Sequence, residues 1–335
     1  MPRVAPVAGI MLSAVLALVA CRQAIALDKI TINYVEPAPY YSPLFIAIDQ
    51  GYFAEEGIEA ETIQAGGGVA TPALLAGDLS FSTSGSVAIS AIMKGAKLKV
   101  LFITSDRPAF EIWAQKAITK VEDLKGLQVG IITRGDTSEI AMRYYLNQHG
   151  LPADYVAYTP LGTGTARVAG ITSATFPAAL LGTSEMAQLK ASGKIDSLHQ
   201  LADLSKEVRM VFSGLAASDA MIKSKPDLVR RVLRGLLKGM RHTKASRADA
   251  MAAMIKRGAD APTAGAQWDD TNALLSESGR TTAAVETAEL KLRADLLGIP
   301  RDQIPPDAAV FDFSFVDQAG AALKAENWKP KTGKP

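Results

Sequence analysis

Short β-like runs alternate with segments of helical periodicity along most of the sequence, and no other property of the chain narrows its fold as much. The first series covers residues 29–104, and a second, similar series covers residues 121–201. Strands separated by single helices are typical of parallel sheets that carry helices on both faces. The sequence therefore predicts an α/β fold made of two similar lobes.

The rest of the chain is predicted to be mainly helical. A strand is expected at 209–215, followed by helices at about 225–245, 247–257, 264–278 and 282–297. The first of these helices has apolar residues on one side and lysine and arginine on the other. Because no aromatic residues are interleaved with the basic ones, we interpret this stripe as a solvated outer face and not as a nucleic-acid contact. A proline-broken tail follows and is expected to pack on the first lobe.

Residues 1–26 have the layout of a secretory signal peptide, with an apolar run at 10–20. The run is too short to span a bilayer, since a transmembrane helix needs about 20 apolar residues. The sequence is compatible with two cleavage sites. Residues 24–26 form an A-x-A motif, and residues 18–21 resemble a lipobox, in which Cys21 would be acylated. The mature chain is therefore predicted to be periplasmic, either free or lipid-anchored at Cys21.

Composition removes several classes of protein. Cys21 is the only cysteine of the chain, so the mature body would have no disulfide, thiol nucleophile or thiolate metal site. The 3 histidines lack the spacing of a metal motif. Removing residues 1–26, which hold two arginines and no acid, brings 36 basic residues to 34, against 34 acidic ones. A neutral chain gives no reason to expect a nucleic-acid partner, and no metal or cofactor is predicted.

Candidate ligand-binding residues in the first lobe follow predicted strands, at the edge where α/β sheets bind ligands near helix N-termini. They are Tyr40, Tyr41, Ser42, Ser84, Gly85 and Ser86. The tyrosines offer an aromatic face and a hydroxyl to a small organic molecule. The serines stand before a predicted helix, where a serine also serves as an ordinary N-cap without any ligand.

The candidates in the second lobe lie at equivalent places. They are Arg134, Asp136, Thr137, Ser138, Thr163, Thr165 and Thr183. The guanidinium of Arg134 would suit a carboxylate or sulfonate, which it binds through two hydrogen bonds. Helix capping explains the hydroxyls and Asp136 equally well, and many loop arginines simply point into water.

Five segments together carry a resemblance to a known family. They are PLFIAIDQGYFAEEGIEAE from Pro43, LLAGDLSFSTSGSVAISAIMKGAKLKVL from Leu74, VEDLKGLQVGI from Val121, LGTGTARVAGITSATFPAALL from Leu161 and KPDLVRRVLRGLLKGM from Lys225. In this order they resemble the periplasmic solute-binding proteins of ABC importers for nitrate, sulfonates, taurine and thiamine-pyrimidine precursors. The chain departs from that family at residues 174–178, where relatives often have G-x-x-D-A. The ligand preferences of the family therefore stay open for this chain.

The resemblance implies a type II periplasmic binding protein, with two α/β lobes around a central cleft and two hinge crossovers. Lobe 1 would comprise residues 27–104 and 214–335, lobe 2 residues 113–212, and the crossover region residues 105–112 and 213. The resemblance also implies a monomer whose partners are a small-molecule ligand and an ABC permease and ATPase complex. Contact with the membrane would occur only through the permease or the lipid anchor.

The predicted function is therefore capture of a small molecule by hinge closure, with no catalysis. The two tyrosines and Arg134 favour a small organic anion as the ligand, either a sulfonate or a carboxylate. Aromatic sulfonates and carboxylates belong to this class. Two alternatives stay open. A sensory binding protein would present its ligand to a membrane kinase. An enzyme on the same fold would resemble the pyrimidine-precursor branch, whose cysteine-rich motif this chain lacks.

Overall fold

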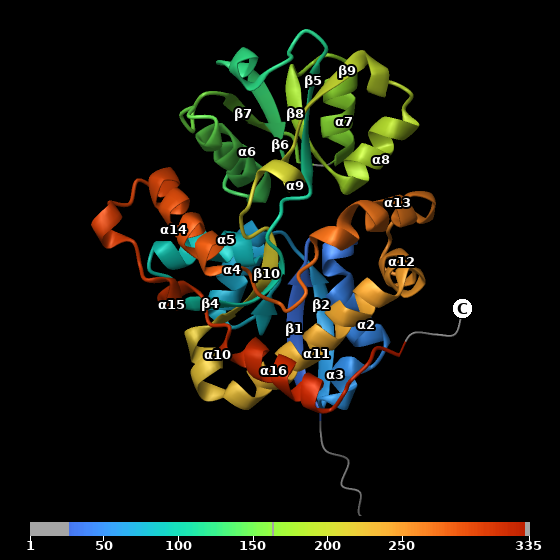
Figure 1. The fold of residues 1–335 in the computed structure, drawn as a ribbon, viewed down its shortest axis with the longest axis vertical. Coiled ribbons are helices and arrows are strands. Elements are labelled where there is room, and N and C mark those ends of the chain that lie inside the picture. Colours follow the sequence, from blue (N-terminus) through green and yellow to red (C-terminus); the bar gives the residue numbers. More distant parts are fainter. Residues whose placement is uncertain (1–26, 163, 332–335) are drawn as a thin grey trace, which may run out of the picture.

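The computed structural model describes residues 27–162 and 164–331, which form two α/β bodies joined by two chain segments (Figure 1). The predicted signal peptide and Cys21 lie outside the described residues. Each body contains one five-stranded sheet with helices around it. Among the described residues, no helix is long and apolar enough to cross a membrane.

The first body contains a mixed sheet in the order β2-β1-β3-β10-β4. Its strands are β1 (Asp28–Tyr34), β2 (Ile58–Gln64), β3 (Phe81–Ser82), β4 (Leu98–Ser105) and β10 (Ser213–Ser218). β1 is parallel to β2 and β3, whereas β10 is antiparallel to β3 and β4. The parallel pairing that the alternation of strands and helices indicates holds for β1, β2 and β3, whereas β10 is antiparallel because it returns from the second body directly beside β4, the strand that left.

The second body contains a mixed sheet in the order β7-β6-β8-β5-β9. Its strands are β5 (Phe110–Gln115), β6 (Gln128–Ile131), β7 (Ala157–Pro160), β8 (Ala178–Gly182) and β9 (Leu198–Asp203). β6 is parallel to β7 and β8, and β5 is antiparallel to β8 and β9. The sequence did not predict β5, because it is the entry strand and no helix separates it from β4.

Two connections join the bodies, between β4 and β5 and between β9 and β10. They are hydrogen-bonded to each other, since Met210 N donates to Asp106 O at 3.0 Å and Phe212 N donates to Ser105 O at 3.0 Å. The first sheet therefore contains four strands that precede the second body in the sequence and one, β10, that follows it. The residue limits assigned to the lobes and crossovers remain a prediction.

Helices of the second body are α6 (Thr137–Gln148), α7 (Gly164–Thr172), α8 (Thr183–Ala191) and α9 (Leu204–Glu207). Those of the first body are α2 (Ser42–Asp49), α3 (Tyr52–Glu55), α4 (Gly67–Ala76), α5 (Gly85–Met93), α10 (Asp219–Ser224), α11 (Pro226–Ala245), α12 (Arg247–Ile255), α13 (Ala261–Thr271), α14 (Ala283–Leu297), α15 (Asp307–Val310) and α16 (Ser314–Ala325). α2 and α3 are separate helices, although residues 44–56 have the apolar spacing of a single helix. Gly51 separates them because it adopts a left-handed φ of 72°.

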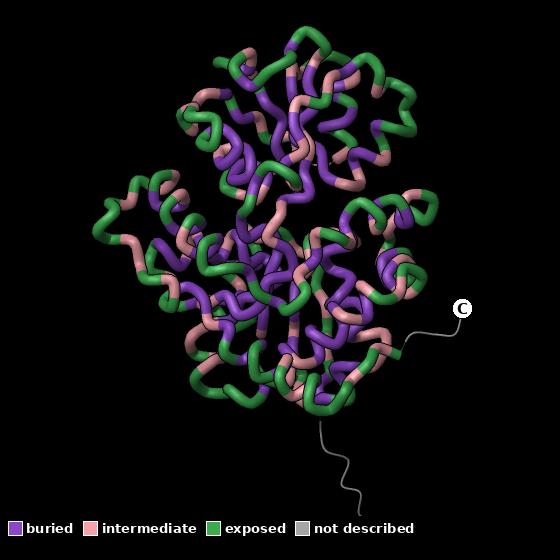
Figure 2. The backbone as a smooth tube through the Cα atoms, viewed as in Figure 1, coloured by how far each residue is buried: buried purple, intermediate pink, exposed green. Residues whose placement is uncertain are grey.

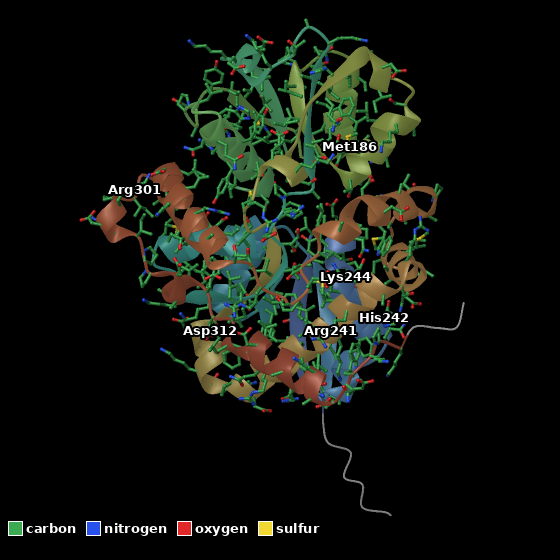
Figure 3. The ribbon with its side chains drawn as sticks, in the orientation of Figure 1. Met186, Arg241, His242, Lys244, Arg301 and Asp312 are labelled. Atoms are coloured by element: carbon green, nitrogen blue, oxygen red, sulfur yellow. The ribbon has the colours of Figure 1, made fainter. Side chains whose placement is uncertain are left out.

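Buried residues run through the centre of both sheets and along the inner faces of the helices (Figure 2). α11 packs against α2 and α16, and not all of its polar residues are solvated as predicted. Lys238 is buried and pairs with Glu55 and Glu56 at 2.8 and 2.6 Å. His242 on the same helix is also buried, between Tyr52 and Asp249 at 2.7 Å from each (Figure 3). Burial is tolerated because every one of these charges and ring nitrogens has a partner.

Candidate functional site

A cleft of about 280 Å³ lies between the two bodies and is lined by residues at the strand ends of both sheets and by Phe212 of the second connection. The first body contributes the 3-10 turn η2 (Pro39–Tyr41) and the N-termini of α4 and α5. The second body contributes the end of β6 and the start of α6. The cleft is therefore at the strand ends where the sequence placed its candidates.

Four aromatic rings form one wall of the cleft. Tyr40 lies between its neighbours, with its ring centre 4.8 Å from that of Tyr41 and 5.0 Å from that of Phe212. Phe212 in turn lies 5.5 Å from Phe110. All three contacts are edge-to-face, which is a favourable packing for aromatic rings. The wall spans η2, the start of β5 and the second connection, so it offers an apolar surface to a flat ligand.

Two carboxyl groups line the same cleft. Glu36 is half-buried and accepts a hydrogen bond from the hydroxyl of Tyr40 at 2.5 Å. Burial, and then the negative charge of Glu185, raise the pKa of Glu36 above its ordinary value. Asp136 is the N-cap of α6 and accepts from Ser138 N at 3.0 Å and Glu139 N at 3.2 Å. Burial raises the pKa of Asp136 as well.

Two helix N-termini also line the cleft. Gly66, the N-cap of α4, has no side chain, and the side chain of Ser84, the N-cap of α5, accepts no hydrogen bond from its helix. Val69 N donates to Gly66 O at 3.0 Å, and the other backbone N–H groups of these first turns lack a side-chain cap, which suits a ligand that accepts hydrogen bonds. The side chain of Ser84 is held from behind by Asn33 Nδ2 at 3.2 Å.

Five of the predicted residues line the cleft together: Tyr40, Tyr41, Ser84, Asp136 and Thr137. They come from η2, α5 and α6, which are far apart in the sequence. The structure thus brings together candidates from both series of strands. Their contact with a ligand remains a prediction.

Four other candidates are buried and do not line the cleft. Ser42 is fully buried at the start of α2, and its hydroxyl has no hydrogen-bond partner among the described residues. Ser86 accepts a hydrogen bond from Arg293 at 2.8 Å. Ser138 accepts from Ile132 N at 2.9 Å. Gly85 permits close packing, because a Cβ atom there would lie 2.8 Å from the carbonyl oxygen of Gly214. These residues were predicted from their position at the start of a helix. That position does not show whether a side chain of the first turn points into the cleft or into the protein core.

Arg134 does not line the cleft. Its guanidinium pairs with Glu139 at 3.2 Å and donates to Tyr158 O at 2.9 Å, and its side chain is 56% exposed. Thr165 is exposed on α7. Thr183 lines a neighbouring cavity of about 460 Å³, which shares Phe110 with the cleft and lies between the second body and the end of α13 with the segment after it. Thr163 lies outside the described residues.

Several lining residues were missed by the sequence analysis. Phe110 is the first residue of β5 and Phe212 belongs to the second connection, and nothing in their local pattern shows that both face the same gap. Ser213 also lines the cleft, and its buried hydroxyl has no hydrogen-bond partner among the described residues. A buried hydroxyl without a partner is costly, so Ser213 is suited to a ligand contact. Glu36 stands four residues before the predicted Tyr40, and this closeness in the sequence was the one signal available.

Known proteins were compared with the chain. The family model described as NMT1/THI5 like matches residues 38–250. The riboflavin-binding protein RibY of Chloroflexus aurantiacus is 26% identical over 233 residues, which cover 66% of this chain and 64% of that protein.

Solved structures share the fold at low sequence identity. One from Bordetella bronchiseptica RB50 has a TM-score of 0.76 at 21% identity and covers 88% of this chain and 98% of its own. The periplasmic aliphatic sulphonate binding protein SsuA of Escherichia coli has a TM-score of 0.68 at 18% identity, covering 92% and 94%. The desulfurization enzyme DSZB also matches, with a TM-score of 0.62 at 15% identity, covering 88% and 99%.

These matches confirm the periplasmic binding protein fold that the resemblance implied. At such identities the solved structures show the fold alone, and the fold is shared by binding proteins and at least one enzyme. The family model, in contrast, matches more than half of the chain. The chain belongs to the NMT1/THI5-like family.

Proposed function

We propose that this chain is the extracytoplasmic solute-binding component of an ABC importer and that it delivers a small molecule to a permease and ATPase complex. The observation that carries the proposal is the cleft, whose lining comes from both bodies and from the second connection between them. A ligand that touches both bodies favours the closed arrangement, which is how two-lobed binding proteins capture solutes. The family and the binding proteins among the relatives support this function.

We propose a flat, uncharged or protonated heterocycle as the ligand, in place of the organic anion expected from the sequence. The expectation of an anion depended on Arg134, which is engaged by Glu139 outside the cleft. None of the described residues that line the cleft is a lysine, arginine or histidine. Glu36 and Asp136 would instead accept hydrogen bonds from ligand N–H groups or repel a carboxylate or sulfonate.

The remaining cleft groups suit the other features of such a heterocycle. The aromatic wall of Tyr40, Tyr41, Phe110 and Phe212 would pack on a ring face. The N-termini of α4 and α5 would donate to a ring carbonyl or ring nitrogen. A cleft of about 280 Å³ is close to the lower limit of about 300 Å³ for ligand sites, so it suits a small, flat ring system. The riboflavin-binding relative is consistent with this class of ligand.

A thermal-shift panel tests the proposal on the purified chain. Riboflavin, lumichrome, aminopyrimidines, aromatic carboxylates, alkanesulfonates and nitrate would be compared at equal concentrations. A ligand that binds only the folded state stabilises it and so raises the melting temperature. At a ligand concentration of 100 times Kd, the free energy of unfolding rises by about 2.7 kcal/mol. We expect a shift with a heterocycle, its loss in Phe212→Ala, and its retention in the surface variant Asp269→Asn.

Two results would contradict parts of the proposal. A shift with sulfonates or nitrate alone would refute the ligand class while leaving the binding function intact. Chromatographic recovery of an altered ligand would indicate an enzyme, the activity found in DSZB on this fold. Co-purification of the chain with a permease, and not with a membrane kinase, would distinguish import from sensing.

A further inference from the structure

A buried ion pair on α14 connects the elements that form the cleft. Glu289 and Arg293 are one helical turn apart, and their side chains are 0% and 1% exposed. Arg293 Nε donates to Glu289 Oε1 at 2.8 Å, and Arg293 Nη2 lies 2.7 Å from the same oxygen. Burying two charges is costly unless their remaining hydrogen-bonding groups find partners. The partners of this pair therefore show which elements it holds.

Arg293 reaches α5, whose N-terminus borders the cleft. Its Nη1 donates to Ser90 Oγ at 2.6 Å and its Nη2 donates to Ser86 Oγ at 2.8 Å. Ser86 is two residues after Ser84, which lines the cleft. Both terminal nitrogens of the Arg293 guanidinium are thus hydrogen-bonded to α5, the helix whose N-terminal N–H groups would face a ligand.

Glu289 reaches the second connection between the bodies. Its Oε2 accepts a hydrogen bond from Val211 N at 3.0 Å. The neighbouring N–H groups of Met210 and Phe212 bond to the first connection, so Val211 N faces the other way. The Glu289 carboxylate thus accepts the hydrogen bond that the carbonyl of a neighbouring strand would accept from Val211 N in a sheet. Phe212, the next residue, is part of the aromatic wall.

A third contact extends from the second body. Tyr144 on α6 is 2% exposed, and its hydroxyl donates to the backbone oxygen of Glu289 at 3.2 Å. α6 begins at Thr137, which lines the cleft from the opposite side. One turn of α14 therefore bonds to α5, to a connection and to the second body.

We infer that Glu289 and Arg293 are positioning residues that fix the rest geometry of the two bodies by bonding α5, Val211 and Tyr144 to one buried turn. This role goes beyond ligand capture, because it concerns the arrangement of the bodies before any ligand binds. Breaking the contacts should leave each body folded and allow a wider range of arrangements between them.

Distances between spin labels on the two bodies of the full-length, ligand-free chain test this inference. The labels would be attached to Glu61→Cys on β2 and Gln148→Cys at the end of α6, both exposed, after Cys21, the only native cysteine, is replaced by Ser. We expect Tyr144→Phe and Glu289→Gln to broaden or shift the distance distribution. The exposed pair of Arg247 and Asp269 supplies the matched control, Asp269→Asn, which should leave the distribution unchanged.

Melting temperatures measured in parallel separate positioning from simple stabilisation. If Tyr144→Phe and Glu289→Gln lower the melting temperature while the distance distribution stays that of the parent, the inference is refuted. If Glu289→Gln does not fold, Tyr144→Phe and Ser90→Ala decide, since each removes one hydroxyl from a contact and leaves the ion pair in place. The experiment needs no ligand, so its failure is distinct from failure of the proposed function.

Discussion

Arg167 and Glu185 form an ion pair that is closed off from solvent near the cleft. Arg167 Nη2 lies 2.6 Å from Glu185 Oε1, and the two side chains are 2% and 7% exposed. Arg167 also donates to Leu180 O at 3.1 Å, and Glu185 accepts from Gly182 N at 2.9 Å. The pair therefore joins α7, α8 and the end of β8. Removing one partner would leave a buried charge without compensation.

Arg167→Met should lower the free energy of unfolding by about 3–5 kcal/mol, the usual cost of leaving one member of a buried pair alone. Urea unfolding followed by circular dichroism measures it. Arg247→Met is the matched control, because its pair with Asp269 is exposed. Equal effects of the two substitutions would show that burial of the Arg167 pair has no special weight.

Glu36 should make stability depend on pH. Burial raises its pKa above the ordinary value of 4.5, and the charge of Glu185 adds to the effect. A carboxyl whose pKa is higher in the folded state stabilises the fold when protonated, and this contribution is lost as pH rises through the interval above 4.5. We expect Glu36→Gln to reduce the fall in melting temperature between pH 4.5 and 7. Asp136 shifts in the same direction, so part of the fall should remain.

The exposed variant Glu61→Gln is the control for this pH series. Its melting temperature should follow that of the parent chain at each pH. A Glu36→Gln profile that coincides with the parent would mean that Glu36 titrates alike in the folded and unfolded states.

At the scale of elements, α4 and α5 meet at their N-termini, where the three glycines 66–68 lie. A Cβ atom at Gly67 would be 2.6 Å from Val87 Cγ2 and 3.2 Å from Ser84 Cβ, so the two helices approach closely only because Gly67 has no side chain. Gly68 has open space around it. Within the glycine run, the packing therefore leaves no room for a side chain at Gly67 but has room for one at Gly68.

Gly67→Ala should destabilise the chain by roughly 1–3 kcal/mol, since an added methyl in a packed contact forces neighbours apart. Gly68→Ala should be neutral or stabilising by up to about 1 kcal/mol, because alanine favours a helix interior. Denaturant unfolding of the two variants, measured side by side, checks the difference. A similar loss in both would contradict the packing argument.

The same glycines show how far sequence reasoning reaches. Three consecutive glycines are typical of a turn, which would place the helix start near Thr71, whereas α4 already begins at Gly67. Alternation of strands and helices predicted the fold class, because burial periodicity is local. It did not predict β5, the antiparallel direction of the strand expected at 209–215, or the inward side of Ser86, because these depend on which distant segments come together. Loop position identified Tyr40 and Thr137 as cleft residues but could not place Phe212 beside them.

For the whole molecule, the two bodies differ in how they are built from the chain. All five strands of the second sheet come from the uninterrupted segment 110–203, and a separate buried cluster around Trp113, Ile171 and Leu189 lies within it. The first sheet draws β10 from a segment more distant in the chain. The two bodies should therefore differ in their ability to fold alone.

A fragment of residues 107–209 should unfold cooperatively on heating, because it holds every strand of its sheet. A fragment of residues 27–104 should not, since it lacks the strand that lies between β3 and β4. Circular dichroism melts of both fragments check this. Cooperative melting of the shorter fragment alone would reverse the assignment.

The place of β10 between β3 and β4 also sets an order of events during biosynthesis. A ribosome releases residues 28–105 first, yet their sheet stays split until residues 213–218 emerge, after the entire second body. Such non-local pairing slows folding, because distant segments must meet before the sheet can close. For a chain that we propose to be exported, late completion would leave the nascent polypeptide loose enough to be threaded through a translocation channel.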